Sequence, residues 1–94
     1  MKPQDEISDI DELIIELDQL FRNAFSREGK RSREQKIVAI LRKLKKLKCS
    51  FNLVEGRNLK SLWIFKYAGG EEIRRSIKVP NEVEAPFRKT GITP

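Results

Sequence analysis

Three aromatic side chains alternate along one short stretch of the sequence. Trp63, Phe65 and Tyr67 occupy every second position of a run rich in β-branched and aromatic residues. In a β-strand, every second side chain lies on the same face. Aromatic rings in a row on an open sheet can stack on the bases of a single-stranded nucleic acid, at about 1–3 kcal/mol per base. The stretch therefore predicts either a stacking platform or three aromatic core residues.

A strong excess of basic side chains precedes this stretch. Between positions 27 and 48 there are ten basic residues against two acidic ones, Glu28 and Glu34. The basic residues are Arg27, Lys30, Arg31, Arg33, Lys36, Arg42, Lys43, Lys45, Lys46 and Lys48. With a net charge of +6 for the whole chain, the pattern favours a polyanionic partner. An equally weighted alternative is a solvated helix face, or one that pairs with acidic side chains of the same protein.

The residues that catalysis and metal binding usually require are scarce. The chain has no histidine and a single cysteine, Cys49. This excludes imidazole general bases and Ser-His-Asp triads, and in effect any zinc site. We interpret Cys49 as a small half-buried residue, and Glu71 and Glu72 as solvated charges beside a turn. The prediction is a protein that is not an enzyme and that uses no metal and no cofactor.

The first element that must position these residues is an amphipathic helix predicted over 9–25. Ser8 is its expected N-cap, with Asp11 as an imperfect capping box. Apolar residues recur at spacings of three and four, which is typical of one helix stripe. They are Ile10, Leu13, Ile14, Leu17, Leu20, Phe21 and Phe25. We interpret the stripe as core; the alternative is a seam for a protein partner or a homodimer, next to an acidic outer face.

A second amphipathic helix is predicted over 33–48. Ser32 and Gln35 would form its capping box. Its apolar stripe consists of Ile37, Ile40, Leu41, Leu44 and Leu47. Steps of 100° per residue place Arg42 and Lys46 opposite this stripe, where they could bind phosphates.

Three strands are expected after the helices. They cover 50–55, the run before Gly69-Gly70, and the run after it, with a turn at 56–58. Pro80 should end the third strand, since proline cannot continue a ladder inside a sheet. Residues 81–94 are expected to be a loosely ordered tail, with room for one short helical turn near 82–85. The predicted fold is one small α+β domain over 1–94, with its core at about 8–80 and two helices packed on a three-stranded antiparallel sheet.

The register of the hairpin decides where the aromatic row lies. A two-residue turn at Gly69-Gly70 would gather Leu62, Ile64, Ile73, Ile77 and Val79 under the helices. The aromatic row would then lie outside, with Arg74, Ser76 and Lys78. A turn of three or five residues would bury the aromatic row, and Lys60, Lys66, Arg74 and Lys78 would cover the outside. We favour the buried version because aromatic rows at strand spacing are more often core.

The stretch from 36 to 93 resembles HicA-type toxins, which are mRNA interferases with a fold like that of double-stranded-RNA-binding domains. The features that carry the resemblance are the Leu/Lys helix (37–48), Glu55-Gly56, Ile64-Phe65, Lys78-Val79-Pro80 and Thr90-Gly91-Ile92. The family's histidine, which follows the glycine, is missing, with Asn58 or Lys60 in that neighbourhood. The resemblance implies RNA binding without cleavage.

The leading functional prediction is a small nucleic-acid-binding module that favours RNA or single strands. The predicted phosphate-binding residues are Lys36, Arg42, Lys43, Lys45, Lys46, Lys60, Lys66, Arg74 and Lys78. The predicted stacking residues are Trp63, Phe65 and Tyr67. The alternative is an interaction or assembly subunit that uses helix 9–25. Without a long apolar run or a secretory segment, we expect a cytoplasmic protein with no membrane contact.

Overall fold

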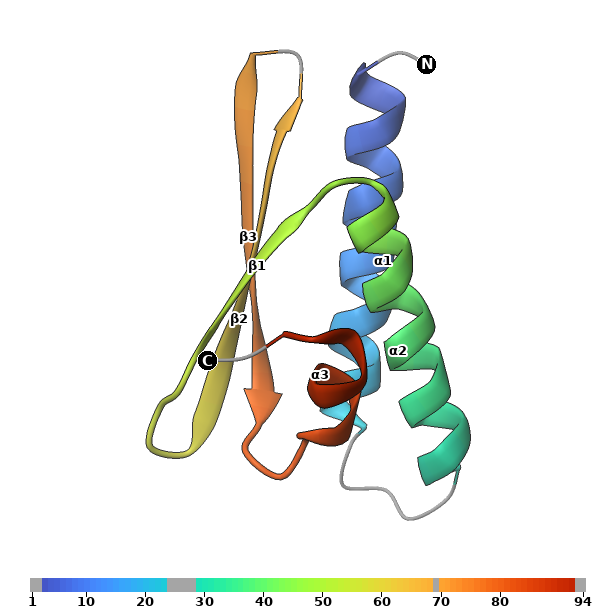
Figure 1. The fold of residues 1–94 in the computed structure, drawn as a ribbon, viewed down its shortest axis with the longest axis vertical. Helices are drawn as coiled ribbons and strands as arrows, with labels where there is room; N and C mark the ends of the chain where they lie inside the picture. The colour runs from blue at the N-terminus through green and yellow to red at the C-terminus, as the bar shows by residue number, and fades with distance from the viewer. Residues whose placement is uncertain (1–2, 24–28, 69, 93–94) are drawn as a thin grey trace.

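The computed structural model describes residues 3–23, 29–68 and 70–92 of the chain. The described elements occur in the order helix, helix, three strands, helix (Figure 1). They are α1 (Pro3–Arg22), α2 (Lys30–Lys46), β1 (Ser50–Val54), β2 (Leu59–Ala68), β3 (Glu71–Pro80) and α3 (Ala85–Thr90). The prediction of an α+β fold with two N-terminal helices on a sheet is confirmed.

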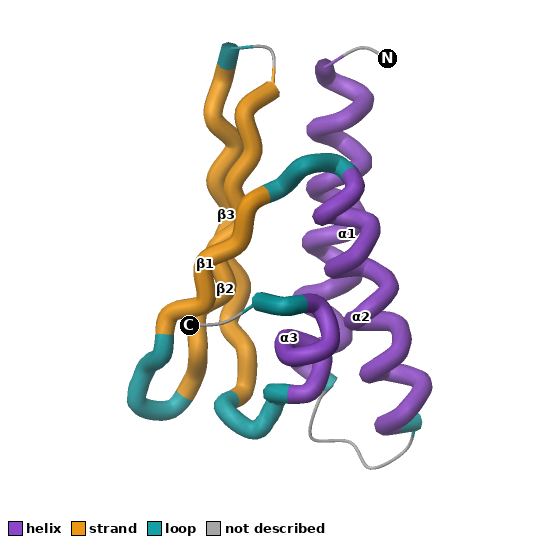
Figure 2. Tube along the Cα trace, viewed as in Figure 1, coloured by secondary structure: helices purple, strands orange, loops and turns teal. Residues whose placement is uncertain are grey.

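The molecule has one layer of strands and one layer of helices (Figure 2). The sheet has the order β1-β2-β3, and both neighbouring pairs are antiparallel. All the helices lie on the same side of the sheet, with α3 between α2 and the sheet at one end (Figure 1). No helix in the described part of the chain covers the other face of the sheet, so the side chains of that face point toward solvent (Figure 1).

The core fills the space between the two layers. The predicted stripes of both long helices supply its helical half, and Leu17, Leu41 and Leu44 are completely buried. The sheet supplies aliphatic side chains from all three strands, namely Leu53, Leu62, Ile64, Ile77 and Val79. Cys49 is also buried. Amphipathic periodicity therefore placed the core of both helices correctly.

The predicted helix starts are wrong. Helix α1 begins at Pro3, so Ser8 lies inside the helix and is not its cap. Proline suits the first turn, because it has no N–H to leave unpaired and its φ already fits a helix. Helix α2 begins at Lys30 after Gly29, whose φ is 67°, and has no side-chain cap, so Ser32 caps nothing. Phe25 lies outside the described residues.

The prediction of a loosely ordered tail is also wrong. Residues 85–90 form α3, with Pro86 in the first turn and Gly91 (φ 75°) at the C-cap. Phe87 is buried and packs on Phe21 of α1, with ring centroids 5.9 Å apart. Ile92 is buried as well. Two apolar anchors in a charged segment were enough to fix it to the core.

None of the helices in the described part of the chain combines the length and the hydropathy that crossing a membrane requires.

Candidate nucleic-acid interface

The strands β2 and β3 adopt the register expected from a two-residue turn at Gly69-Gly70. Ala68 pairs with Glu71, and further along the ladder Leu62 pairs with Ile77. Gly70 has φ 81°, a left-handed conformation that tight hairpin turns require and that glycine adopts without strain. This register places Trp63, Phe65 and Tyr67 on the face away from the helices.

The favoured prediction, in which the aromatic row is core, is therefore wrong. The physical reason is the parity of the pairing: only this register gathers the aliphatic residues of both strands on one face. The gathered residues are Leu62, Ile64, Ile73, Ile77 and Val79, each at most 7% exposed. The other register would have moved Leu62 and Ile64 into solvent, away from the leucine and isoleucine stripes of the helices.

We call the solvent-facing side of the sheet the outer face. The strand registers assign it Ser50, Asn52, Val54, Ser61, Trp63, Phe65, Tyr67, Glu72, Arg74, Ser76 and Lys78. Trp63 and Phe65 are half-buried and nearly parallel, with centroids 6.3 Å apart and planes 12° apart. Tyr67 is 75% exposed. The outer face thus has two rings held against each other and a third standing free of the core.

Two basic residues of β3, Arg74 and Lys78, lie on the same face of the sheet as the aromatic row of β2. The guanidinium carbon of Arg74 lies 5.5 Å from the centroid of the Phe65 ring, which is cation–π geometry. Arg74 also forms an exposed ion pair with Glu72, 3.3 Å from Nη2 to Oε1. The ammonium of Lys78 donates to the hydroxyl of Ser61 at 2.9 Å. Both cations are exposed and lie beside aromatic or hydroxyl groups.

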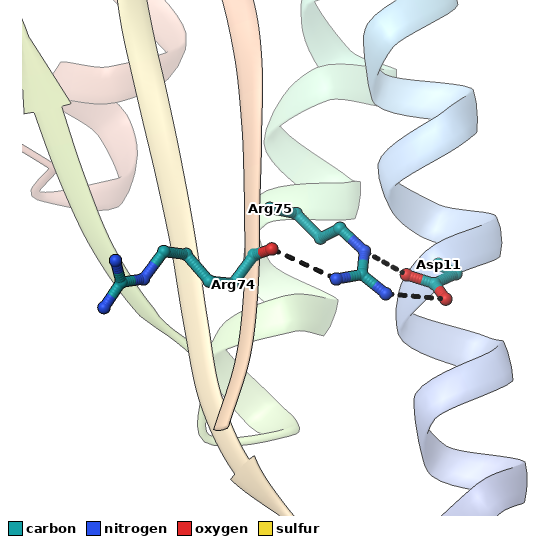
Figure 3. A network of polar contacts seen from close by, with 3 residues as sticks. All are labelled: Asp11, Arg74 and Arg75. Carbon is teal, nitrogen blue, oxygen red and sulfur yellow. Dashed lines mark hydrogen bonds and ion pairs between the residues drawn. The ribbon is translucent and has the colours of Figure 1, made fainter. Parts of the chain in front are cut away.

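Arg74 and Arg75 are neighbours in sequence but point to opposite sides of the sheet (Figure 3). Arg75 faces the helices, and its Nε donates to Oδ1 of Asp11 on α1 at 3.0 Å. Its second contact with the same carboxylate, from Nη2 to Oδ2, is 3.5 Å long. Arg74 belongs to the outer face, whereas Arg75 joins α1 to the sheet.

Three of the predicted phosphate-binding lysines instead donate to backbone carbonyls. Lys66 donates to the carbonyl of Leu47 at the end of α2, and Lys45 donates to that of Thr90 at the end of α3. Lys60 is only 8% exposed and donates to the carbonyl of Asn81 at 3.3 Å. The last carbonyls of a helix lack partners within it and carry partial negative charge, which explains two of these contacts.

This arrangement corrects the expected outer surface of the sheet. Lys60 and Lys66 pair with Val79 and Ile73 and share their helix-facing side. The prediction that placed both lysines outside, together with Arg74 and Lys78, is wrong. It followed from the register that the structure does not adopt.

The remaining predicted cations, Lys36, Arg42, Lys43 and Lys46, are exposed on α2. Because α2 lies on the helical side of the sheet, its exposed side is far from the outer face (Figure 2). Lys43 and Lys46 line a groove of about 430 Å³ whose other wall carries Asp9, Glu12 and Glu16 of α1. These carboxylates would repel a phosphate at the groove. The structure therefore separates the two basic surfaces that the sequence suggested.

Asn52 and Ser50 of β1 also belong to the outer face and were absent from the predicted site. Asn52 pairs with Trp63, and Ser50 pairs with Phe65. The alternation of β1 already indicates that Asn52 lies opposite Leu53. Which residue it faces on β2 depends on how residues 55–58 close the connection, and only the structure gives that.

In the described ranges, no three His, Cys, Asp or Glu side chains gather in a way that could hold a metal ion.

Comparison with known proteins finds no matching family model, no matching curated protein and no matching solved structure. The resemblance to HicA-type toxins therefore stays a prediction.

Proposed function

We propose that this protein binds single-stranded RNA on the outer face of its sheet. The observation that carries the proposal is the cluster of Trp63, Phe65 and Arg74 on the face that no helix covers. Bases can stack on exposed rings, and nearby cations can hold the phosphates that link them. The alternative surface on α2 is weaker, because its lysines lie opposite carboxylates.

The two rings support binding because they are already ordered. Their mutual contact, and the guanidinium over Phe65, restrict side-chain motion before any ligand arrives. A ligand then loses less conformational entropy on binding to them than on binding to free side chains. Tyr67, at 75% exposure, extends the row toward the hairpin tip and would accept a further base.

The charge of the outer face supports a polyanion of modest affinity. Arg74 and Lys78 supply two positive charges. Glu72 partly neutralises the charge of Arg74 through their ion pair. Binding to single strands weakens with salt by a log–log slope of about 0.7 for each phosphate neutralised. Two phosphate contacts therefore predict a slope of about −1.4 for the logarithm of the binding constant against the logarithm of the salt concentration.

The test is a titration of Trp63 fluorescence with a short single-stranded RNA, at low and then moderate salt. Trp63 is the only tryptophan, so its quenching reports on the outer face alone. Phe65→Leu keeps this probe and should weaken binding by about 1–3 kcal/mol, the usual contribution of one base–aromatic stack. Single-stranded DNA of the same sequence shows whether the ribose hydroxyl contributes.

Arg74 and Arg75 provide a matched pair of variants. Arg74→Gln should weaken RNA binding and flatten the salt dependence by about 0.7. Arg75→Gln removes the same charge from the helix-facing side and should leave fluorescence quenching almost unchanged. Glu72→Gln should strengthen binding. Equal effects of the two arginine variants, or no complex at low salt, would contradict the proposal.

A second candidate function is self-association through α1, the alternative that the apolar stripe suggested. The groove between α1 and α2 has half-buried Leu13 and Leu47 between its acidic and basic walls. Two copies related by a two-fold axis would place the carboxylates of one against the lysines of the other. Sedimentation equilibrium over a range of concentrations tests it, and a constant mass of 11.0 kDa would exclude it.

A further inference from the structure

The outer face has two chemically different borders on either side of its aromatic row. The strand registers divide the face into cross-strand rows, each with one residue from every strand. The rows are Ser50–Phe65–Arg74, Asn52–Trp63–Ser76 and Val54–Ser61–Lys78. Both cations of these rows are on β3, whereas β1 contributes uncharged side chains only.

This asymmetry gives a bound strand one orientation. Arg74 and Lys78 are four positions apart on the same side of β3, which corresponds to about 13 Å along a strand. Phosphates are therefore attracted to the β3 border. Bases stacked on the rings of β2 then extend toward β1, where no charge competes for them.

Asn52 is the polar group that such a base meets first. It pairs directly with Trp63 and is exposed. Directly paired side chains on one face of an antiparallel sheet have Cβ atoms about 4.5–5.5 Å apart. A base lying over the indole of Trp63 is thus within reach of the Asn52 amide, on the border opposite the phosphates.

The amide places an N–H donor of its NH2 group beside its carbonyl acceptor. Adenine presents the complementary pair on its Hoogsteen edge, with N6–H as donor and N7 as acceptor. Guanine presents two acceptors there, O6 and N7, so the amide can satisfy only one of them. An asparagine at this position distinguishes the two purines, whose rings stack on tryptophan alike.

We propose that Asn52 is the specificity-determining residue of the outer face and reads the Hoogsteen edge of an adenine stacked on Trp63. The proposal rests on the RNA-binding function proposed above. It adds a base preference, a named residue that causes it, and the direction in which the bound strand faces.

The experiment uses the full chain and uridine oligonucleotides that carry one central adenosine or one central guanosine. Fluorescence of Trp63 measures both affinities. The wild type should favour adenosine by about tenfold, a ratio within the range of a bidentate base contact. Asn52→Leu should reduce this ratio to about one. Asn58→Leu, the matched control in the exposed turn between β1 and β2, should keep the tenfold preference.

The outcomes distinguish a failure of the Asn52 proposal from a failure of the RNA-binding proposal. If the wild type binds both oligonucleotides equally well, or if Asn52→Leu keeps the preference, Asn52 does not read the base although RNA binding stands. The same conclusion follows if a folded Asn52→Leu protein, checked by circular dichroism, loses affinity for both oligonucleotides equally. If neither oligonucleotide binds the wild type at low salt, both proposals are overturned.

Discussion

The guanidinium of Arg75 on β3 contacts the carboxylate of Asp11 on α1, with 3.0 Å between Nε and Oδ1 across 64 positions of sequence (Figure 3). The contact joins the first helix to an edge strand. A charged side chain that points inward from an edge strand also discourages pairing with another sheet. The two adjacent arginines therefore have different roles. Arg75 joins β3 to α1, whereas Arg74 belongs to the outer face.

We expect the Asp11–Arg75 pair to add little stability. Both side chains are partly exposed, at 38% and 45%, so solvent screens the attraction. A double-mutant cycle with Asp11→Asn and Arg75→Gln should give a coupling of about 0.2–1 kcal/mol in urea denaturation. A coupling above about 2 kcal/mol would mean that the pair is far better shielded than these exposures indicate.

Lys66 and Lys78 should respond in opposite ways to substitution by methionine. Lys66→Met removes the donor to the carbonyl of Leu47 at the end of α2 and should lower the free energy of unfolding by about 1–3 kcal/mol. Lys78→Met removes an exposed charge, so stability should change by less than about 0.5 kcal/mol while RNA affinity falls. Urea denaturation and RNA titration of both variants check this, and a loss of affinity for Lys66→Met alone would reverse the assignment.

Phe87 should anchor α3 to the core. Its ring is 3% exposed and packs on Phe21, so Phe87→Ala should cost about 3–5 kcal/mol. In a domain this small that loss could unfold the chain, and Phe87→Leu provides a milder variant with the same direction. Arg88→Ala, exposed on the same helix, should change the unfolding free energy by less than about 0.5 kcal/mol. Equal effects at both positions would mean that the segment contributes no packing.

The ion pair between Glu34 and Lys89 should make stability depend on acid pH. The hydrogen bond from Lys89 Nζ, 2.8 Å from Oε1, lowers the pKa of Glu34 below its ordinary value of 4.5. A depressed folded-state pKa means that this contribution is present above pH 4.5 and is lost as the pH falls through the folded pKa. An NMR titration of the Glu34 carboxyl should show Lys89→Met raising that pKa, and Arg88→Met leaving it unchanged.

Local patterns in the sequence were sufficient for most of the fold. The spacing of Ile10, Ile14 and Leu17 already indicated which side of α1 is buried, and the same holds for Ile37, Leu41 and Leu44 in α2. Gly69-Gly70 and Pro80 marked a turn and a strand end. These features depend on neighbours a few positions apart, so periodicity and turn chemistry report them directly.

The helix α3 in the last segment was harder to predict from the sequence. Pro86 and Gly91 are start and stop signals for a short helix, and Phe87 supplies its apolar contact. Six residues are too few to form a stable helix alone, so nothing local requires the helix to exist. Packing of Phe87 on Phe21, a residue of α1, stabilises it.

By itself, the sequence determined two amphipathic helices, a hairpin, an aromatic row and an excess of positive charge. Only the tertiary structure decided that Trp63 faces solvent, because strand parity depends on how β2 and β3 bury their aliphatic residues together against the helices. Likewise, only the tertiary structure assigned Lys66 to a helix end and Arg74 to the outer face. A lysine or arginine has the same charge at every position, and its role depends on the groups that folding brings to it from distant parts of the chain.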